Sequence, residues 1–121
     1  MANLIDAAMF AFLRDLIRHW NESNVEAISA LFREDAALSS PFGVENSASP
    51  WVQGRHEIGR HLQDTRSRYQ GFEIVDVATN NPFYTLLLRS GRDYLTIIIE
   101  PERPPLLIRR MIICKSIFHV R

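Results

Sequence analysis

Three short runs of leucine and isoleucine constrain the fold more than any other feature of this chain. Residues 86–88, 97–99 and 112–113 each place bulky apolar side chains next to one another. Neighbouring residues of a β-strand point to opposite faces of a sheet, so each run makes both faces apolar. An antiparallel sheet with one face in water alternates apolar and polar residues instead. We therefore expect helices on one face and a second copy of the chain on the other; curling of the sheet upon itself is the alternative.

The remaining elements follow from periodicity and turn residues. Strands are expected over residues 72–79, 83–90, 94–100 and 106–121, and a further strand over 35–40. A capping box at residues 23–26 predicts a second helix, and a third is expected over 55–68. A first helix is predicted by apolar residues three or four positions apart: Ile5, Met9, Phe12, Leu13, Leu16 and Trp20. Three helices packed on one antiparallel sheet make an α+β domain.

Length and charge limit the classes of partner. The 121 residues suit a single domain over 1–121. Fourteen basic and fourteen acidic side chains cancel, which argues against nucleic acid and membrane surfaces as partners. Cys114 is the only cysteine, so no disulfide can form within the chain. With no signal peptide at the N-terminus and no membrane-length apolar run, a cytoplasmic location is expected.

Two stretches carry a family resemblance. The sequences "ALFREDAALSSPFG" and "GRHEIGRHL", with the order helix, helix, strand, loop, helix and strands, resemble the SnoaL-like members of the NTF2-like superfamily. That superfamily includes ketosteroid isomerases, polyketide cyclases, dehydratases and proteins that only bind or dimerise. The resemblance implies a cone-shaped, cystatin-like fold in which a curved sheet encloses an apolar pocket. It implies no cofactor.

The residues that carry catalysis in the isomerases are replaced here. In the resembling motif an aspartate before the proline is the general base, and this chain has Ser40 at that position. A tyrosine of the first helix corresponds by spacing to Leu16. A serine hydroxyl does not accept a proton near neutral pH without a neighbouring base, and leucine donates no hydrogen bond to a developing enolate. The resemblance therefore implies the scaffold without this chemistry, and no catalytic residue is assigned.

A ligand pocket inside the cone would need polar or aromatic lining groups. Six residues are the candidates: Ser40, Trp51, His56, His61, Tyr84 and Tyr94. Trp51 lies near the end of a long loop over residues 41–53 and could cap the pocket, whereas the two tyrosines could instead pack as a cross-strand pair. The histidines are five positions apart, which is about 140° around a helix, so no metal site is expected.

Other reactive side chains have plainer explanations. Asp35 is expected to form a helix cap or an ion pair with an arginine. Cys114 is expected to be a small core residue. Arg109 and Arg110 are adjacent on a predicted strand, so one should point inward and one outward, and the sequence leaves open which.

Two functional interpretations remain open. In the first, the chain binds a small hydrophobic ligand of steroid or polyketide size, with isomerase, cyclase or dehydratase chemistry as the activity that the resemblance implies. In the second, it is a non-catalytic dimerisation or binding module whose cone is filled by its own side chains. Both interpretations include a homodimer through the sheet.

Overall fold

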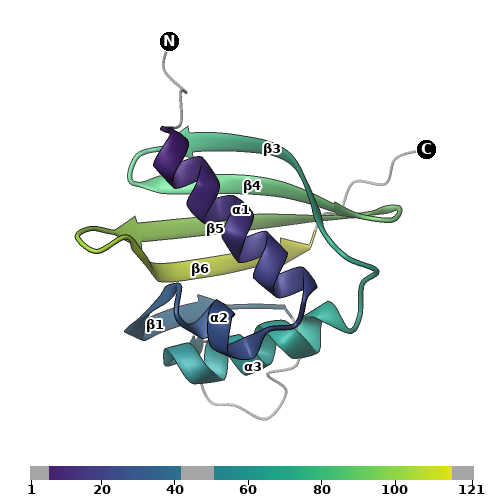
Figure 1. Cartoon of the computed structure of the whole chain (residues 1–121). Coiled ribbons are helices and arrows are strands. Elements are labelled where there is room, and N and C mark those ends of the chain that lie inside the picture. The colour runs from purple at the N-terminus through teal and green to yellow at the C-terminus, as the bar shows by residue number, and fades with distance from the viewer. Residues whose placement is uncertain (1–5, 42–50, 116–121) are drawn as a thin grey trace.

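A computed structural model describes residues 6–41 and 51–115 of the chain, and Figure 1 shows its arrangement. Across these residues the chain forms three helices and six strands, which confirms the α+β class. The elements in chain order are α1 (Ala7–Asn21), α2 (Val25–Ser29), β1 (Phe32–Ser39), β2 (Trp51–Gln53), α3 (Arg55–Arg66), β3 (Glu73–Asn80), β4 (Phe83–Ser90), β5 (Asp93–Glu102) and β6 (Leu107–Lys115). None of the helices in the described ranges has the length and apolar content of a membrane span.

The six strands form one sheet in the order β2-β1-β6-β5-β4-β3. Neighbouring strands are antiparallel except for β1 and β6, which run parallel. The expectation of a wholly antiparallel sheet is therefore wrong at this junction. Parallel neighbours need a long connection, and more than half of the chain, residues 40–106, lies between β1 and β6. Periodicity within one strand carries no information about which distant strand it will join.

Alternate residues of the long strands form the face of the sheet that carries the core. In the centre of that face are Leu86 and Leu88 of β4, Leu95, Ile97 and Ile99 of β5, and Met111 and Ile113 of β6, all buried. Helix α1 crosses this face (Figure 1) and buries its own stripe against it. Met9, Leu13, Leu16 and Trp20 have no exposed surface. The predicted stripe is thus confirmed over its described residues, and Ile5 lies outside them.

Several element boundaries differ from those expected. Helix α2 is capped by Asn24, whose side chain accepts a hydrogen bond from the Ala27 amide at 3.1 Å, and not by Ser23. Ser23 has a φ of 54°, which is unsuited to the extended backbone of a helix cap. Phe32 begins β1 instead of lying in the second helix. Strand β2 occupies the end of the expected loop, where Trp51 pairs with Ser39.

The end of α1 is tied to two segments that are distant in sequence. The Trp20 indole N–H donates to the Leu62 carbonyl of α3 at 2.7 Å, and its ring lies 4.3 Å from that of Phe72. The Asn21 side chain donates to the Phe72 carbonyl at 2.8 Å and accepts from the Phe72 amide at 2.7 Å. These contacts fix the direction in which the chain enters β3.

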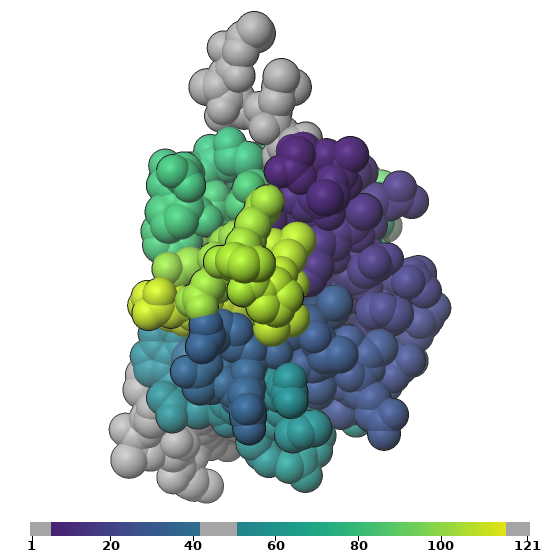
Figure 2. All heavy atoms as spheres, turned by 60° about the vertical axis from the view of Figure 1, so that its left-hand side comes forward, coloured from purple at the N-terminus to yellow at the C-terminus, as the bar shows by residue number. Residues whose placement is uncertain are grey.

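The turn between β5 and β6 covers one end of the core. In Figure 2 this turn, coloured yellow-green, lies between the N-terminal end of α1 in purple and β1 in blue. Arg103 in the turn forms an ion pair with Asp6, the N-cap of α1, at 3.6 Å. Leu106 packs against the core from the same turn. The turn therefore adds apolar cover where α1 begins.

The contact between α2 and α3 depends on a residue with no side chain. A Cβ at Gly59 would lie 2.4 Å from Ser29 Oγ and 3.0 Å from the Val25 carbonyl oxygen. Gly59→Ala should therefore lower the free energy of unfolding by about 1–3 kcal/mol through overpacking, although alanine is the better helix former by about 1 kcal/mol. Urea unfolding measures the change.

A second substitution tests whether the clash is the cause. Ser29 Oγ is buried and has no hydrogen-bond partner in the described part of the chain, so Ser29→Ala alone should cost little. The double variant Ser29→Ala, Gly59→Ala should recover part of the stability lost in Gly59→Ala. A Gly59→Ala protein as stable as the wild type would contradict this account of the helix contact.

Candidate functional site

Large apolar side chains occupy the interior of the domain, on the face of the sheet where the resemblance implies a pocket. Leu16, Trp20 and Phe32 reach it from α1 and β1, and each is fully buried. Leu38 of β1 and Leu62 of α3 are also fully buried. Four of the surface cavities formed by the described residues have none of the six predicted ligand residues in their lining. The part those six residues take in ligand binding stays a prediction.

Ser40 and Trp51 lie at one end of the β1–β2 pair. Ser40 directly follows β1 and is half-buried. Trp51 pairs with Ser39, whose neighbour Leu38 points into the core. Because side chains alternate along a strand, Ser39 and Trp51 share the face of the sheet that points away from the core. Residues 42–50 of the loop that precedes Trp51 lie outside the described residues, and the role of Trp51 as a cap over a pocket stays a prediction.

The two tyrosines lie on opposite faces of the sheet. Tyr84 pairs with Ile99 and packs against the core, whereas Tyr94 pairs with Arg89. They therefore do not form the cross-strand pair considered from the sequence, because the turn sets a register that offsets them. Glu73, through a side-chain hydrogen bond, raises the pKa of Arg89, and Tyr94 adds to that shift.

The histidines of α3 have different surroundings. His56 is exposed near the start of the helix. His61 is half-buried, and its Nε2 atom is enclosed without a hydrogen-bond partner in the described part of the chain. Burial lowers the pKa of His61, and this outweighs the opposing effect of Asp64. Within the described residues no group of three or more metal-ligating side chains comes together.

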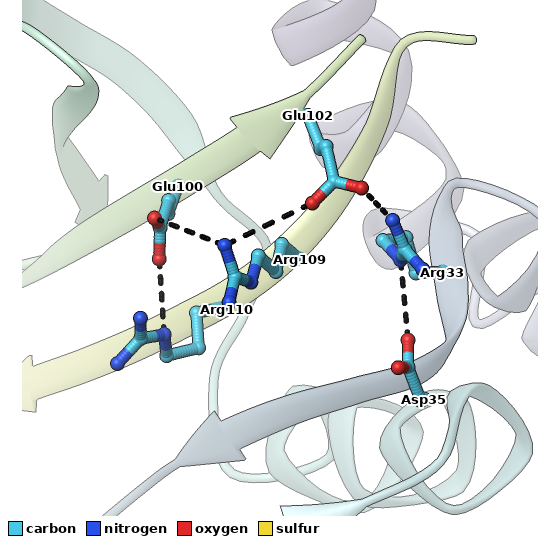
Figure 3. Close-up of polar contacts among 6 residues, drawn as sticks. All are labelled: Arg33, Asp35, Glu100, Glu102, Arg109 and Arg110. Carbon is cyan, nitrogen blue, oxygen red and sulfur yellow. Dashed lines mark hydrogen bonds and ion pairs between the residues drawn. The ribbon is translucent and has the colours of Figure 1, made fainter. Parts of the chain in front are cut away.

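Arg109 and Arg110 both point away from the core. They are 55% and 48% exposed and lie near the same carboxylate, Glu100, at 4.0 Å and 2.9 Å (Figure 3). The expectation that one would point inward is wrong because the β5–β6 register shifts between Glu100 and Pro101. This bulge leaves Arg109 as an extra residue between the paired positions and interrupts the alternation of side chains.

The arginines belong to a network of charged residues. Arg109 also approaches Glu102 at 3.9 Å, and Arg33 pairs with Glu102 and, at 3.1 Å, with Asp35 (Figure 3). The ion pair expected for Asp35 is thus confirmed. Three arginines and three carboxylates balance, so the network provides no excess charge for an ionic ligand. It forms a charged boundary at one end of the sheet.

Between this network and Arg89 lies an uncharged surface that we call the outer band. It lies on the face of the sheet opposite the core, and its members are half-buried except for the exposed Cys114. The outer band consists of Ala37, Ser39, Trp51, Thr85, Leu87, Thr96, Ile98, Ile112 and Cys114. The expectation of a buried Cys114 is wrong, because its strand position places it on this face, paired with Thr96.

The structure contains a groove between α1 and β3 that the sequence did not predict. It has a volume of about 820 Å³, and Phe10 of α1 and Val75 of β3 are among its lining residues. Phe10 falls outside the buried stripe of α1, which could have marked it as a surface aromatic. Val75 could not have been identified, because a register shift between Ile74 and Asp76 exposes it.

Acid should destabilise the fold through His61. Its folded-state pKa lies below the ordinary value of 6.5, so the unfolded chain binds the proton more readily. The stabilising contribution is complete above pH 6.5 and is lost as pH falls toward the lowered value. His61→Gln should therefore flatten the fall of the urea midpoint with acidification. His56 is exposed, so His56→Gln should keep the wild-type slope. Equal slopes in wild type and His61→Gln would contradict the assignment of this pH dependence to His61.

Comparisons with known proteins agree with the geometry. The sequence model of the SnoaL-like domain matches residues 13–105. A search of curated protein sequences finds no match.

Solved structures share the fold at low sequence identity. A SnoaL-like protein of unknown function from Burkholderia thailandensis is 15% identical, with a TM-score of 0.77 over 94% of this chain and 98% of that one. A cystatin-like protein of unknown function from Methylobium petroleophilum is 16% identical, with a TM-score of 0.75 over 98% and 82%. A candidate ketosteroid isomerase from Kribbella flavida is 18% identical, with a TM-score of 0.62 over 92% and 79%. With three quarters of its length matched by the domain model, the chain belongs to the SnoaL-like domain family.

Proposed function

We propose that the chain is a homodimeric binding module with a filled interior, and that the outer band forms the contact between subunits. The observation that carries this proposal is the uncharged outer band, which extends over five strands of the sheet. A second copy of the same surface would remove its leucine, isoleucine and tryptophan side chains from water.

The distribution of charges around the outer band favours a specific contact between subunits over nonspecific association. The uncharged centre lies between the pair of Arg89 and Glu73 at one end and the pairs of Glu100 at the other. A centre without charges and a polar rim are typical of protein interfaces. Glu100 is the least exposed of these charged groups, at 14%, so the rim is already organised in one subunit.

The filled interior favours binding over isomerase chemistry. Leu16 and Ser40 stand where the resembling isomerases have a tyrosine and an aspartate, and Leu16 is fully buried. Apolar packing at this point provides no donor for a developing oxyanion. The function we propose therefore rests on surfaces of the domain and not on a reacting centre in its core.

Ile98→Glu tests the interface at the centre of the outer band. Ile98 pairs with Thr85 on one side and Ile112 on the other, so a carboxylate there would be buried in the dimer without a partner. We expect the dimer dissociation constant to rise about 100-fold or more. Light scattering should give twice the 14.0 kDa chain mass for the wild type and 14.0 kDa for the variant.

Val75→Glu is the matched control. It makes the same change from an apolar side chain to a carboxylate on a strand, at a position that is 46% exposed and outside the outer band. It should remain dimeric. Cys114 gives a second readout, because dimerisation should slow its reaction with a thiol reagent and Ile98→Glu should restore the rate. A monomeric wild type at micromolar concentration would exclude the proposal.

A further inference from the structure

The groove between α1 and β3 lies apart from both the filled interior and the outer band. Its apolar lining includes Ile17, Ile74 and Val77. Phe10 and Val75 also line it, and they are the large hydrophobic side chains that the described part of the chain leaves exposed, at 40% and 46%. Its volume of about 820 Å³ is within the range of small-molecule sites. The full lining is Phe10, Arg14, Ile17, Arg18, Asn21, Glu22, Ile74, Val75, Asp76 and Val77.

The charged residues of the groove are not equivalent. Arg18 pairs with Asp15 at 3.1 Å, and Glu22 lies 3.6 Å from His19. Asp76 accepts a hydrogen bond from the Val77 amide at 2.9 Å.

Arg14 differs from these three residues. Its guanidinium lies over the Phe10 ring, 5.9 Å from the centroid, and no acidic side chain of the described residues pairs with it. The groove thus combines an apolar surface with the Arg14 cation, which has no anionic partner among residues 6–41 and 51–115. An apolar molecule that carries a single negative charge is complementary to it.

A small ligand fits this surface better than an added strand of another protein. Strand β3 is at the edge of the sheet, and regular edge strands can pair with extended peptides. The bulge at Val75 interrupts the regular spacing of backbone groups that such pairing needs. The Val77 amide already donates a hydrogen bond to the Asp76 carboxylate.

We propose that this groove binds a small amphipathic carboxylic acid from solution. The apolar body of the acid lies on Ile17, Ile74 and Val75, and its carboxylate pairs with Arg14. A guanidinium presents several N–H donors in a plane that matches a carboxylate, and Phe10 keeps that guanidinium at the edge of the apolar surface. This site goes beyond the dimer proposed above and shares no residue with the outer band.

The test compares two probes with the same phenylalkyl body, one ending in a charged carboxylate and the other in a neutral hydroxyl. We would titrate isotope-labelled protein with 4-phenylbutyrate and with 4-phenylbutanol and follow backbone amide NMR shifts. The acid should bind about fivefold more tightly than the alcohol, as expected for a partly exposed ion pair. Both should shift amides of α1 and β3, and added salt should reduce the preference for the acid.

Variants locate the charge and the apolar contact. Arg14→Gln should lower the affinity for the acid to that for the alcohol and leave the alcohol unchanged. Arg92→Gln, in the exposed turn between β4 and β5, is the control and should bind both probes like the wild type. Val75→Glu should weaken both probes. Ile98→Glu should bind both normally, so failure of the dimer proposal can be distinguished from failure of this one.

Several results would overturn the proposal. Equal affinities for the acid and the alcohol would remove the role of Arg14, as would equal losses in Arg14→Gln and Arg92→Gln. Shifts confined to other elements would place the site elsewhere, and the absence of binding by either probe would remove the site. Binding of vesicles containing phosphatidylglycerol without binding of free 4-phenylbutyrate would indicate a membrane surface instead.

Discussion

The packing of Trp20 is the interaction on which the rest of the arrangement depends. Its indole lies where α1 ends, donates to the Leu62 carbonyl of α3 and contacts the ring of Phe72 ahead of β3. One side chain therefore joins the end of α1 to two segments that lie more than 40 residues further along the chain. The side chain of the neighbouring Asn21 forms hydrogen bonds with both the backbone amide and the carbonyl of Phe72. A fully buried indole is stable there because its one polar group has a partner.

With these segments fixed, large apolar side chains pack between the helices and the sheet. Leu16 occupies the core at the position that corresponds by spacing to a catalytic tyrosine. Close packing leaves little space at such a position, since protein interiors are as dense as organic crystals. The function proposed above therefore depends on the groups that the outer faces of the sheet and of α1 present to the solvent. The outer band and the α1–β3 groove are two separate surfaces of that kind.

Two bulges determine the character of these surfaces. One lies in β6 at Arg109 and directs two arginines toward Glu100, which gives the outer band its charged end. The other lies in β3 at Val75 and exposes that side chain in the groove. Each bulge adds one residue to a strand and reverses the facing of the side chains beyond it. A single inserted residue in a strand therefore changes which chemistry faces the solvent.

The sequence by itself determined the α+β class, the apolar stripe of α1, the β4 strand from Phe83 to Ser90, and an apolar second face of the sheet. These features follow from periodicity within one segment, which neighbouring residues decide through local geometry. Only the tertiary structure decided that β1 joins β6 in parallel, that Tyr84 and Tyr94 face opposite ways, and that Arg109 shares a face with Arg110. Pairing, register and bulges depend on contacts between segments far apart in the chain, where the energy of the whole sheet outweighs any local preference.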